Sequence, residues 1–288
     1  MPLDQQDVDT WTYDEHGRPL PEEKEMSFVD HLEELRWHVV RALVAIAIGG
    51  VVLFIFRDWY FREVLFGPLN DDFYSYNVLC RLSNWLGTGG ALCMTAPNVE
   101  IQAIEFGEQF ITAVKMAFVG GFVIAFPYVF YEIWSFVRPG LYREEQQATR
   151  WVILICSILF FIGVAFGFFI IAPFGTNFLM GFEVGGAVNQ PKMASVIGYM
   201  VMFTLPAALI FELPVLIHFL ASFGLVTAEG MRKYRRHSII GILILASLLT
   251  PPDVVTQILI ALPLTLLYEV SVFVARRAER KYQAELDA

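Results

Sequence analysis

The sequence carries little charge and lacks the motifs of catalysis and metal binding. Charged residues make up 17% of the 288 residues, whereas a soluble domain carries about 25%. Hydrophobic residues make up 56%, and the 26 phenylalanines suit helices that face lipid. Together with a mean hydropathy of +0.55, this composition excludes an ordinary soluble domain and indicates a membrane protein.

No enzyme signature is found along the chain. None of the five histidines stands in a His-Glu-x-x-His helix, and neither a Gly-x-Ser-x-Gly elbow nor a Walker loop occurs. The glycine-rich stretches at 87–90 and 185–186 are expected to be turns. We therefore predict no enzymatic activity, no cofactor, no metal site and no nucleic-acid partner.

The net charge of −9 is concentrated at the N-terminus. Residues 1–35 contain eleven acidic residues against Arg18 and Lys24, which accounts for the whole excess. Because the first apolar run begins only at Trp37, behind this acidic segment, we expect no cleavable signal peptide. The first apolar helix would then act as its own insertion signal, and residues 1–26 would form a flexible acidic leader.

Six apolar segments predict an all-α, polytopic membrane protein with six transmembrane helices. Crossing about 30 Å of hydrocarbon takes about 20 helical residues. The fifth segment has only 12 residues and rises about 18 Å, and Pro263 interrupts the sixth, so the last two helices are predicted to be short. The segments run over residues 37–56, 110–134, 151–174, 195–222, 238–249 and 254–274.

Lysine and arginine residues set the predicted orientation. They cluster after the second, fourth and sixth segments, at 138–150, 232–236 and 276–281, and are sparse on the other side. The positive-inside rule then places both termini in the cytoplasm. Residues 27–276 form the predicted membrane domain, with an outer loop at about 57–109, and residues 277–288 form a cytoplasmic tail.

Cys80 and Cys93 both fall in the predicted outer loop, where an oxidising compartment permits a disulfide between them. Its role would be structural. Cys156 lies in the third segment and is most simply a small core residue.

Two groups of carboxylates flank the predicted cytoplasmic face. Ser27 and Asp30 read as a capping box that opens a helix, and Glu33 and Glu34 follow on its polar side. Glu144 and Glu145 follow the turn at 139–140. Such carboxylates can accept arginine guanidinium groups in bidentate fashion; the alternatives are a solvated helix face and an ordinary helix start.

Glu212 and Glu269 are expected to lie within the membrane. An ionised side chain at that depth costs about 2.5–3.5 kcal/mol, so each should face protein or a water-filled cavity. Pro206 and Pro214 are expected to bend the helix around Glu212. Protonation with a structural hydrogen bond is the alternative for both residues. For His218 an interhelical hydrogen bond is favoured over a role in a proton relay.

An ordered set of short motifs resembles the TatC family, the multispanning component of the twin-arginine protein translocase. The resemblance covers roughly residues 27–276. The acidic leader and the enlarged, Cys-containing outer loop exceed the family pattern. The matching stretches are HLEELR at 31–36, GPL at 67–69, YEIWSF at 131–136, RPGLY at 138–142, FELP at 211–214 and LTPPDV at 249–254 with Gln257.

The resemblance implies a receptor in a bacterial cytoplasmic (inner) membrane. It would bind signal peptides bearing paired arginines and, with single-span TatA- and TatB-type subunits, help export folded proteins using the proton-motive force. The bilayer and further copies in an oligomer would be its other partners. The resemblance assigns Glu34 and Glu145 to the arginine pair, with support from Arg36, Phe136, Pro139 and Arg143.

The resemblance also assigns residues inside and beyond the membrane. Glu212, Glu269 and Gln257 would be polar intramembrane residues near the docking surface for a partner helix. Structural turns would be formed by Pro68, Pro251, Pro252 and Asp253. Two alternatives are a proton-coupled small-solute secondary transporter, with Glu212 and Glu269 as proton carriers, and an intramembrane enzyme, which the absence of a nucleophile–base pair disfavours.

Overall fold

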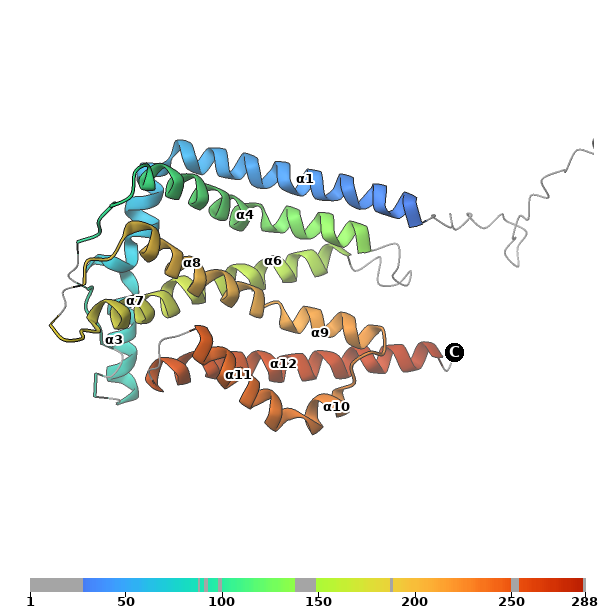
Figure 1. The fold of residues 1–288 in the computed structure, drawn as a ribbon. Helices are drawn as coiled ribbons and strands as arrows, with labels where there is room; N and C mark the ends of the chain where they lie inside the picture. Colours follow the sequence, from blue (N-terminus) through green and yellow to red (C-terminus); the bar gives the residue numbers. More distant parts are fainter. Residues whose placement is uncertain are drawn as a thin grey trace, which may run out of the picture.

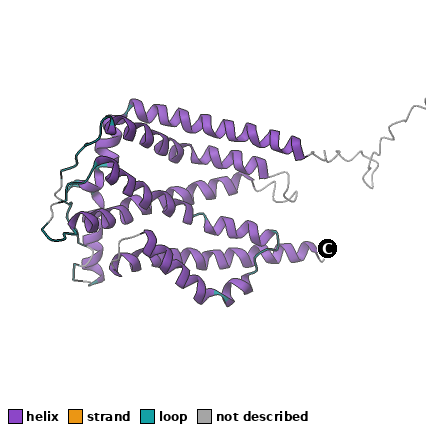
Figure 2. Cartoon of the chain, viewed as in Figure 1, coloured by secondary structure: helices purple, strands orange, loops and turns teal. Residues whose placement is uncertain are grey.

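The computed structural model is helical almost throughout its described residues, and Figure 2 shows helices joined by loops, with no strand in that part of the chain. Residues 1–27, 138–148 and 250–253 lie outside the description. The described residues are 28–87, 89–90, 93–97, 100–137, 149–186, 189–249 and 254–286.

Helical elements account for most of the described residues. In chain order they are α1 (Phe28–Ile55), α2 (Arg57–Trp59), η1 (Tyr60–Leu65), η2 (Gly67–Leu69), α3 (Tyr74–Leu86), α4 (Glu108–Val137), α6 (Thr149–Phe166), η4 (Gly167–Ile171), α7 (Ala172–Gly181), α8 (Met193–Ile210), α9 (Leu213–Ser222), α10 (Ala228–Lys233), α11 (Arg235–Leu249) and α12 (Val254–Leu286).

Four stretches of the described chain are long and apolar enough to cross a membrane. They are Glu33–Ile55, Glu108–Val137, Trp151–Gly181 and Met193–Ser222. They coincide with the first four apolar segments, so the prediction of an all-helical membrane architecture is confirmed at this level. The fifth segment forms α11, whose 15 residues rise about 22 Å. α12 runs without a break from Val254 past Pro263 and through the predicted tail to Leu286, so the prediction that Pro263 interrupts and shortens the last helix is wrong.

The long helices lie side by side, and α3 runs across one end of them (Figure 1). We name the two ends by residues. The Glu34 end holds the start of α1, the end of α4, the start of α6 and the end of α12. The Pro68 end holds η2, α3 and the start of α8.

Glycines bring α1 and α4 into close contact. A Cβ atom at Gly121 of α4 would lie 2.5 Å from the backbone nitrogen of Gly50 and 2.5 Å from the carbonyl oxygen of Ile46, both in α1. Such a distance is excluded by sterics, so the two backbones can approach this closely only because Gly121 has no side chain. Small residues at the contact are the usual way for membrane helices to pack.

Glu212 lies where the fourth long span is interrupted. α8 ends at Ile210 and α9 begins at Leu213, and Phe211 and Glu212 form a turn between them. Pro214 stands in the first turn of α9, where its missing N–H leaves no helical hydrogen bond unmade. Pro214 therefore stands at the break near Glu212, whereas Pro206 lies inside α8, which continues past it to Ile210.

The segment at 57–109 is more structured than the sequence interpretation of a long outer loop. It contains the 13-residue helix α3, which buries Tyr76, Leu79 and Ser83 and ends at Gly87 with φ +67°. The Tyr76 hydroxyl donates a hydrogen bond to the carbonyl oxygen of Pro68. The interpretation of this segment as a loop missed the buried face, which together with the C-terminal Gly87 is a helix signal.

Candidate functional site

Glu34 has a carboxylate oxygen with no partner. Its side chain is about one-third exposed (37%), and Oε1 lies 4.0 Å from Nε2 of His38, one turn later in α1. Oε2 is buried and has no hydrogen-bond partner among the described residues. A buried acceptor without a donor is uncommon in folded proteins and needs an explanation.

His38 connects this carboxylate to α4. Its Nδ1 lies 2.5 Å from Oε2 of Glu132, and the two side chains are 14% and 4% exposed. Arg41 and Tyr128 are further polar neighbours of Glu132. A carboxylate as deeply buried as that of Glu132 requires such partners, because an unpaired buried charge is strongly unfavourable.

Phe136 completes the part of the predicted arginine site that the structure describes. Its ring lies edge-on to the His38 ring, with 6.3 Å between the centroids. Glu34 and Phe136 therefore flank one imidazole, although they belong to different helices. Arg36 lies exposed on α1. The predicted site residues Pro139, Arg143 and Glu145 fall outside the described residues.

The sequence interpretation gave no role to His38 or Glu132. Glu132 was quoted only as part of a motif, and His38 only as a histidine outside any metal pattern. A signal was available, because each is a polar residue inside an apolar segment next to its predicted cytoplasmic end. Such residues are expected to find each other across a helix contact.

Glu212 faces α6 from the turn between α8 and α9. Both carboxyl oxygens are buried and lack a hydrogen-bond partner in the described part of the chain. The thiol of Cys156 and the backbone of Phe160 lie beside the carboxyl, but neither makes a hydrogen bond of normal geometry with it. Glu212 thus meets the expectation that it faces protein rather than lipid.

Glu269 and Gln257 have partners in α11. Nε of Arg235 lies 2.6 Å from Oε1 of Glu269, and the Gln257 amide donates to the carbonyl oxygen of Leu243 over 3.2 Å. Both contacts tie α12 to the helix that precedes it. Pro68 is fully buried, whereas Pro251, Pro252 and Asp253, which are predicted to form a turn, lie outside the described residues.

Glu108 is a structural residue that the sequence interpretation missed. Its Oε2 accepts hydrogen bonds from the backbone N–H groups of Ile104 (2.8 Å) and Glu105 (3.1 Å). Its Oε1 accepts one from Ala194 (2.9 Å), in the first turn of α8. The carboxylate thereby satisfies an orphan donor at a helix N-terminus and joins α4 to α8 at the Pro68 end.

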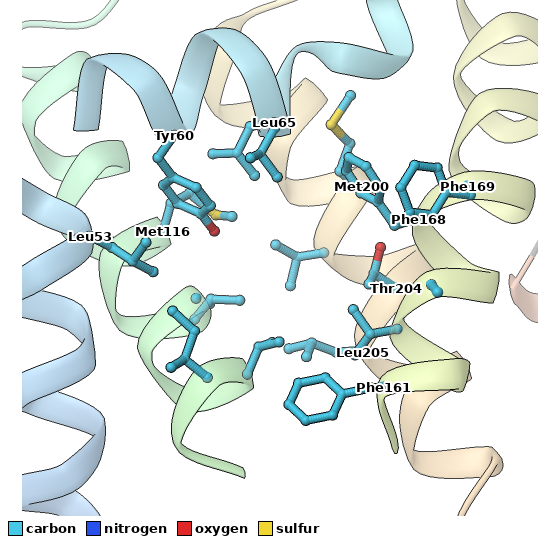
Figure 3. A pocket seen from close by; sticks show the side chains of 18 of the residues that line it. Leu53, Tyr60, Leu65, Met116, Phe161, Phe168, Phe169, Met200, Thr204 and Leu205 are labelled. Atoms are coloured by element: carbon cyan, nitrogen blue, oxygen red, sulfur yellow. The ribbon is translucent and has the colours of Figure 1, made fainter. Parts of the chain in front are cut away.

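An apolar cavity of about 410 Å³ lies between two pairs of helices (Figure 3). Leu53 and Met116 line it from α1 and α4, and Phe161 and Met200 line it from α6 and α8. Tyr60 contributes a hydroxyl, and burial raises its pKa to about 12. Glu212 does not line this cavity, and the described residues hold no cluster of three or more metal-ligating side chains.

Comparison with known proteins gives a consistent answer. Residues 30–263 match the family model of the Sec-independent protein translocase protein (TatC). The TatC protein of Blattabacterium sp. subsp. Periplaneta americana is 33% identical over 262 residues, which is 90% of this chain and 98% of that protein. The TatC protein of Desulforapulum autotrophicum is 34% identical over 264 residues, which is 92% of this chain and 89% of that protein.

Solved structures agree with the sequence relatives. A crystal structure of the twin-arginine translocase receptor TatC superposes with a TM-score of 0.60 at 28% identity, covering 86% of this chain and 99% of that one. A second, in DDM, gives a TM-score of 0.64 over 85% of this chain. The resemblance read from the motifs is therefore confirmed, and this multispanning membrane protein, a component of a protein translocase rather than an enzyme, belongs to the TatC family.

Proposed function

We propose that the protein is the receptor subunit of a twin-arginine translocase and binds paired arginines at the Glu34 end. The observation that carries the proposal is the buried Oε2 of Glu34, which has no donor among the described residues. A guanidinium group supplies N–H donors of the required kind and positive charge at once. The crystallised relatives are named as the receptor of this system, which supports the same role here.

The chemistry of the site favours arginine over lysine. A carboxylate presents two oxygens in a plane, and the planar guanidinium fork can donate to both. Glu34 offers one such carboxylate, and Glu145 is the proposed second. Phe136 beside His38 adds an aromatic surface on which a guanidinium can stack.

The proposed orientation has six membrane crossings with both termini in the cytoplasm of a bacterial inner membrane. Exposed basic residues of the described chain gather near the Glu34 end, at 232–236 and 276–280, as the positive-inside rule expects for the cytoplasmic side. α11 and the first part of α12 would then form a short hairpin that crosses a locally thinned bilayer or is sheltered by its neighbours.

Within this proposal, Glu212 lies at the surface where a single-span TatA- or TatB-type helix or the signal peptide docks. Its two oxygens, which have no hydrogen-bond partner among the described residues, would accept a hydrogen bond from a polar group of the incoming helix. The complex would export folded proteins at the expense of the proton-motive force. A solute transporter is less well supported, because the ion pair of Glu269 with Arg235 gives one of its two proposed proton carriers a structural partner.

Binding of a synthetic signal peptide to the detergent-purified full-length chain tests the proposal. The wild type should bind an Arg–Arg peptide more tightly than the matched Lys–Lys peptide, and Glu34→Gln combined with Glu145→Gln should abolish that preference. Glu33→Gln, a change of an exposed neighbour on α1, is the control. Equal binding of both peptides by the wild type, or an unchanged preference in the double variant, would contradict the assignment.

A further inference from the structure

A groove separate from the Glu34 site opens on the side of the bundle between α6, α9 and α12. Its volume is about 410 Å³, within the range of about 300–1,000 Å³ that small-molecule sites occupy. Most of the lining is aliphatic or aromatic. It comes from Val152, Ile155 and Leu159 of α6, Pro214, Val215 and His218 of α9, and Val270, Phe273, Val274, Arg277 and Ala278 of α12.

The groove faces outward rather than into the protein core. Ile155, Val270 and Phe273 line it and are 46%, 50% and 69% exposed. In a membrane protein, apolar side chains this exposed on the flank of the bundle meet lipid chains. The groove is therefore accessible to the bilayer from the side.

One end of the groove lies at the membrane interface. Trp151, which is 69% exposed, precedes Val152 on α6, and exposed tryptophan marks the headgroup level of a bilayer. From Val152 the lining extends along α6 to Leu159, a rise of about 10 Å. On α12, which runs the opposite way, the lining extends from Val270 to Arg277. Arg277 therefore lies at the interfacial mouth, and the rest of the groove lies deeper.

The positive charge at this mouth is not neutralised within the described chain. Arg277 forms no ion pair with a described residue. Two acidic residues close to Arg277 in the sequence of α12 have other partners. Oε2 of Glu279 accepts a hydrogen bond from the backbone of Ala228, and Glu269 pairs with Arg235. Arg280, one turn after Arg277, is exposed and adds to the positive charge.

We infer that this groove is a binding site for an anionic phospholipid. An acyl chain would lie along the apolar lining, and the phosphate would accept hydrogen bonds from the Arg277 guanidinium. An apolar channel with a cation at headgroup depth matches both parts of such a lipid, whereas a peptide helix would leave the arginine facing its apolar side chains. The inference depends on insertion in a membrane and not on the proposed arginine-binding function.

Native mass spectrometry of the detergent-purified full-length chain tests the inference with dioleoylphosphatidylglycerol and dioleoylphosphatidylcholine as probes. The wild type should bind the first copy of the anionic lipid about fivefold more tightly, the effect of about one interfacial arginine. Arg277→Gln should remove that preference. Arg276→Gln is the control, because Arg276 is an equally charged neighbour that does not line the groove. Ile155→Trp, a change at an exposed position, should fill the groove and weaken both lipids.

Three results would overturn the inference. The first is a wild type without preference for the anionic lipid, and the second is a loss in Arg276→Gln as large as that in Arg277→Gln. The third concerns the molecule that occupies the groove in cells. A photo-crosslinking residue placed at Val274 should label lipid if the inference is correct. Labelling of a signal peptide or another polypeptide instead would make the groove a protein-docking surface.

Discussion

His38 and Glu132 join the first turns of α1 to the last turns of α4 through a contact of 2.5 Å between Nδ1 and Oε2. The same imidazole directs Nε2 toward Glu34 at 4.0 Å. The carboxylate proposed to receive an arginine thus lies beside a side chain that contacts a second helix. Such support from neighbouring groups is what keeps a binding residue in a productive geometry.

Loss of the imidazole should destabilise the protein and weaken peptide binding together. His38→Ala would leave the buried Glu132 carboxylate without this partner, which should lower the free energy of unfolding by about 1.5–3 kcal/mol, the usual value for a hydrogen bond to a charged group. Thermal unfolding in detergent measures the change. Val39→Ala, at a neighbouring position that is 47% exposed, should have little effect, and an equal loss in both variants would refute the role of His38.

A methyl group at Gly121 should separate α1 from α4. Because the added Cβ would meet the backbones of Gly50 and Ile46 at 2.5 Å, Gly121→Ala should cost about 1–3 kcal/mol, as overpacking does. Gly198→Ala is the matched control, since nothing lies within 4 Å of its added Cβ; it should be neutral or slightly stabilising. Thermal unfolding of the two variants measures the difference. Similar melting temperatures for Gly121→Ala and Gly198→Ala would contradict the close packing of α1 against α4.

Glu108 should matter far more than its neighbour Glu105. Glu108→Ala removes the acceptor of three backbone N–H groups and should cost at least about 2 kcal/mol. Glu105→Ala removes a surface ion pair with Lys192 at 3.0 Å, and such pairs contribute at most about 1 kcal/mol. Hydrogen exchange at the Ala194 amide should accelerate only in Glu108→Ala. Unchanged protection there would show that the contact does not hold the start of α8.

Thiol counting tests the link between Cys80 and Cys93, which the structure joins in a disulfide across 13 positions. Of the three cysteines, only the buried Cys156 is free. The denatured, unreduced protein should take up one maleimide per chain, and the reduced protein three. Uptake of three before reduction would rule out the disulfide in the purified protein.

The sequence was sufficient for local features and insufficient for contacts between distant helices. Hydrophobic runs located the four long spans, and Pro214 indicated a distortion of the helix near Glu212, because these signals act within a few residues of their effect. α3 was missed although its turn glycine, Gly87, was noted.

The contacts of His38 with Glu132 and of Glu108 with Ala194 could not be derived in the same way. They join residues 94 and 86 positions apart, and no periodicity in one segment specifies which residue of another segment it meets. Glu34 was found through a motif. The groove beside Arg277 required the relative placement of α6, α9 and α12, which hydrophobicity alone does not give.

A double-mutant cycle measures whether Glu34 receives an arginine of the signal peptide. Affinities would be measured for the wild type and Glu34→Gln, each with the Arg–Arg peptide and with two peptides in which one or the other arginine is glutamine. We expect a coupling free energy of about 1.5 kcal/mol or more between Glu34 and one of the two arginines. We expect no coupling when Glu33→Gln replaces Glu34→Gln. Additive effects with both peptides, or equal coupling to Glu33, would contradict this role of Glu34.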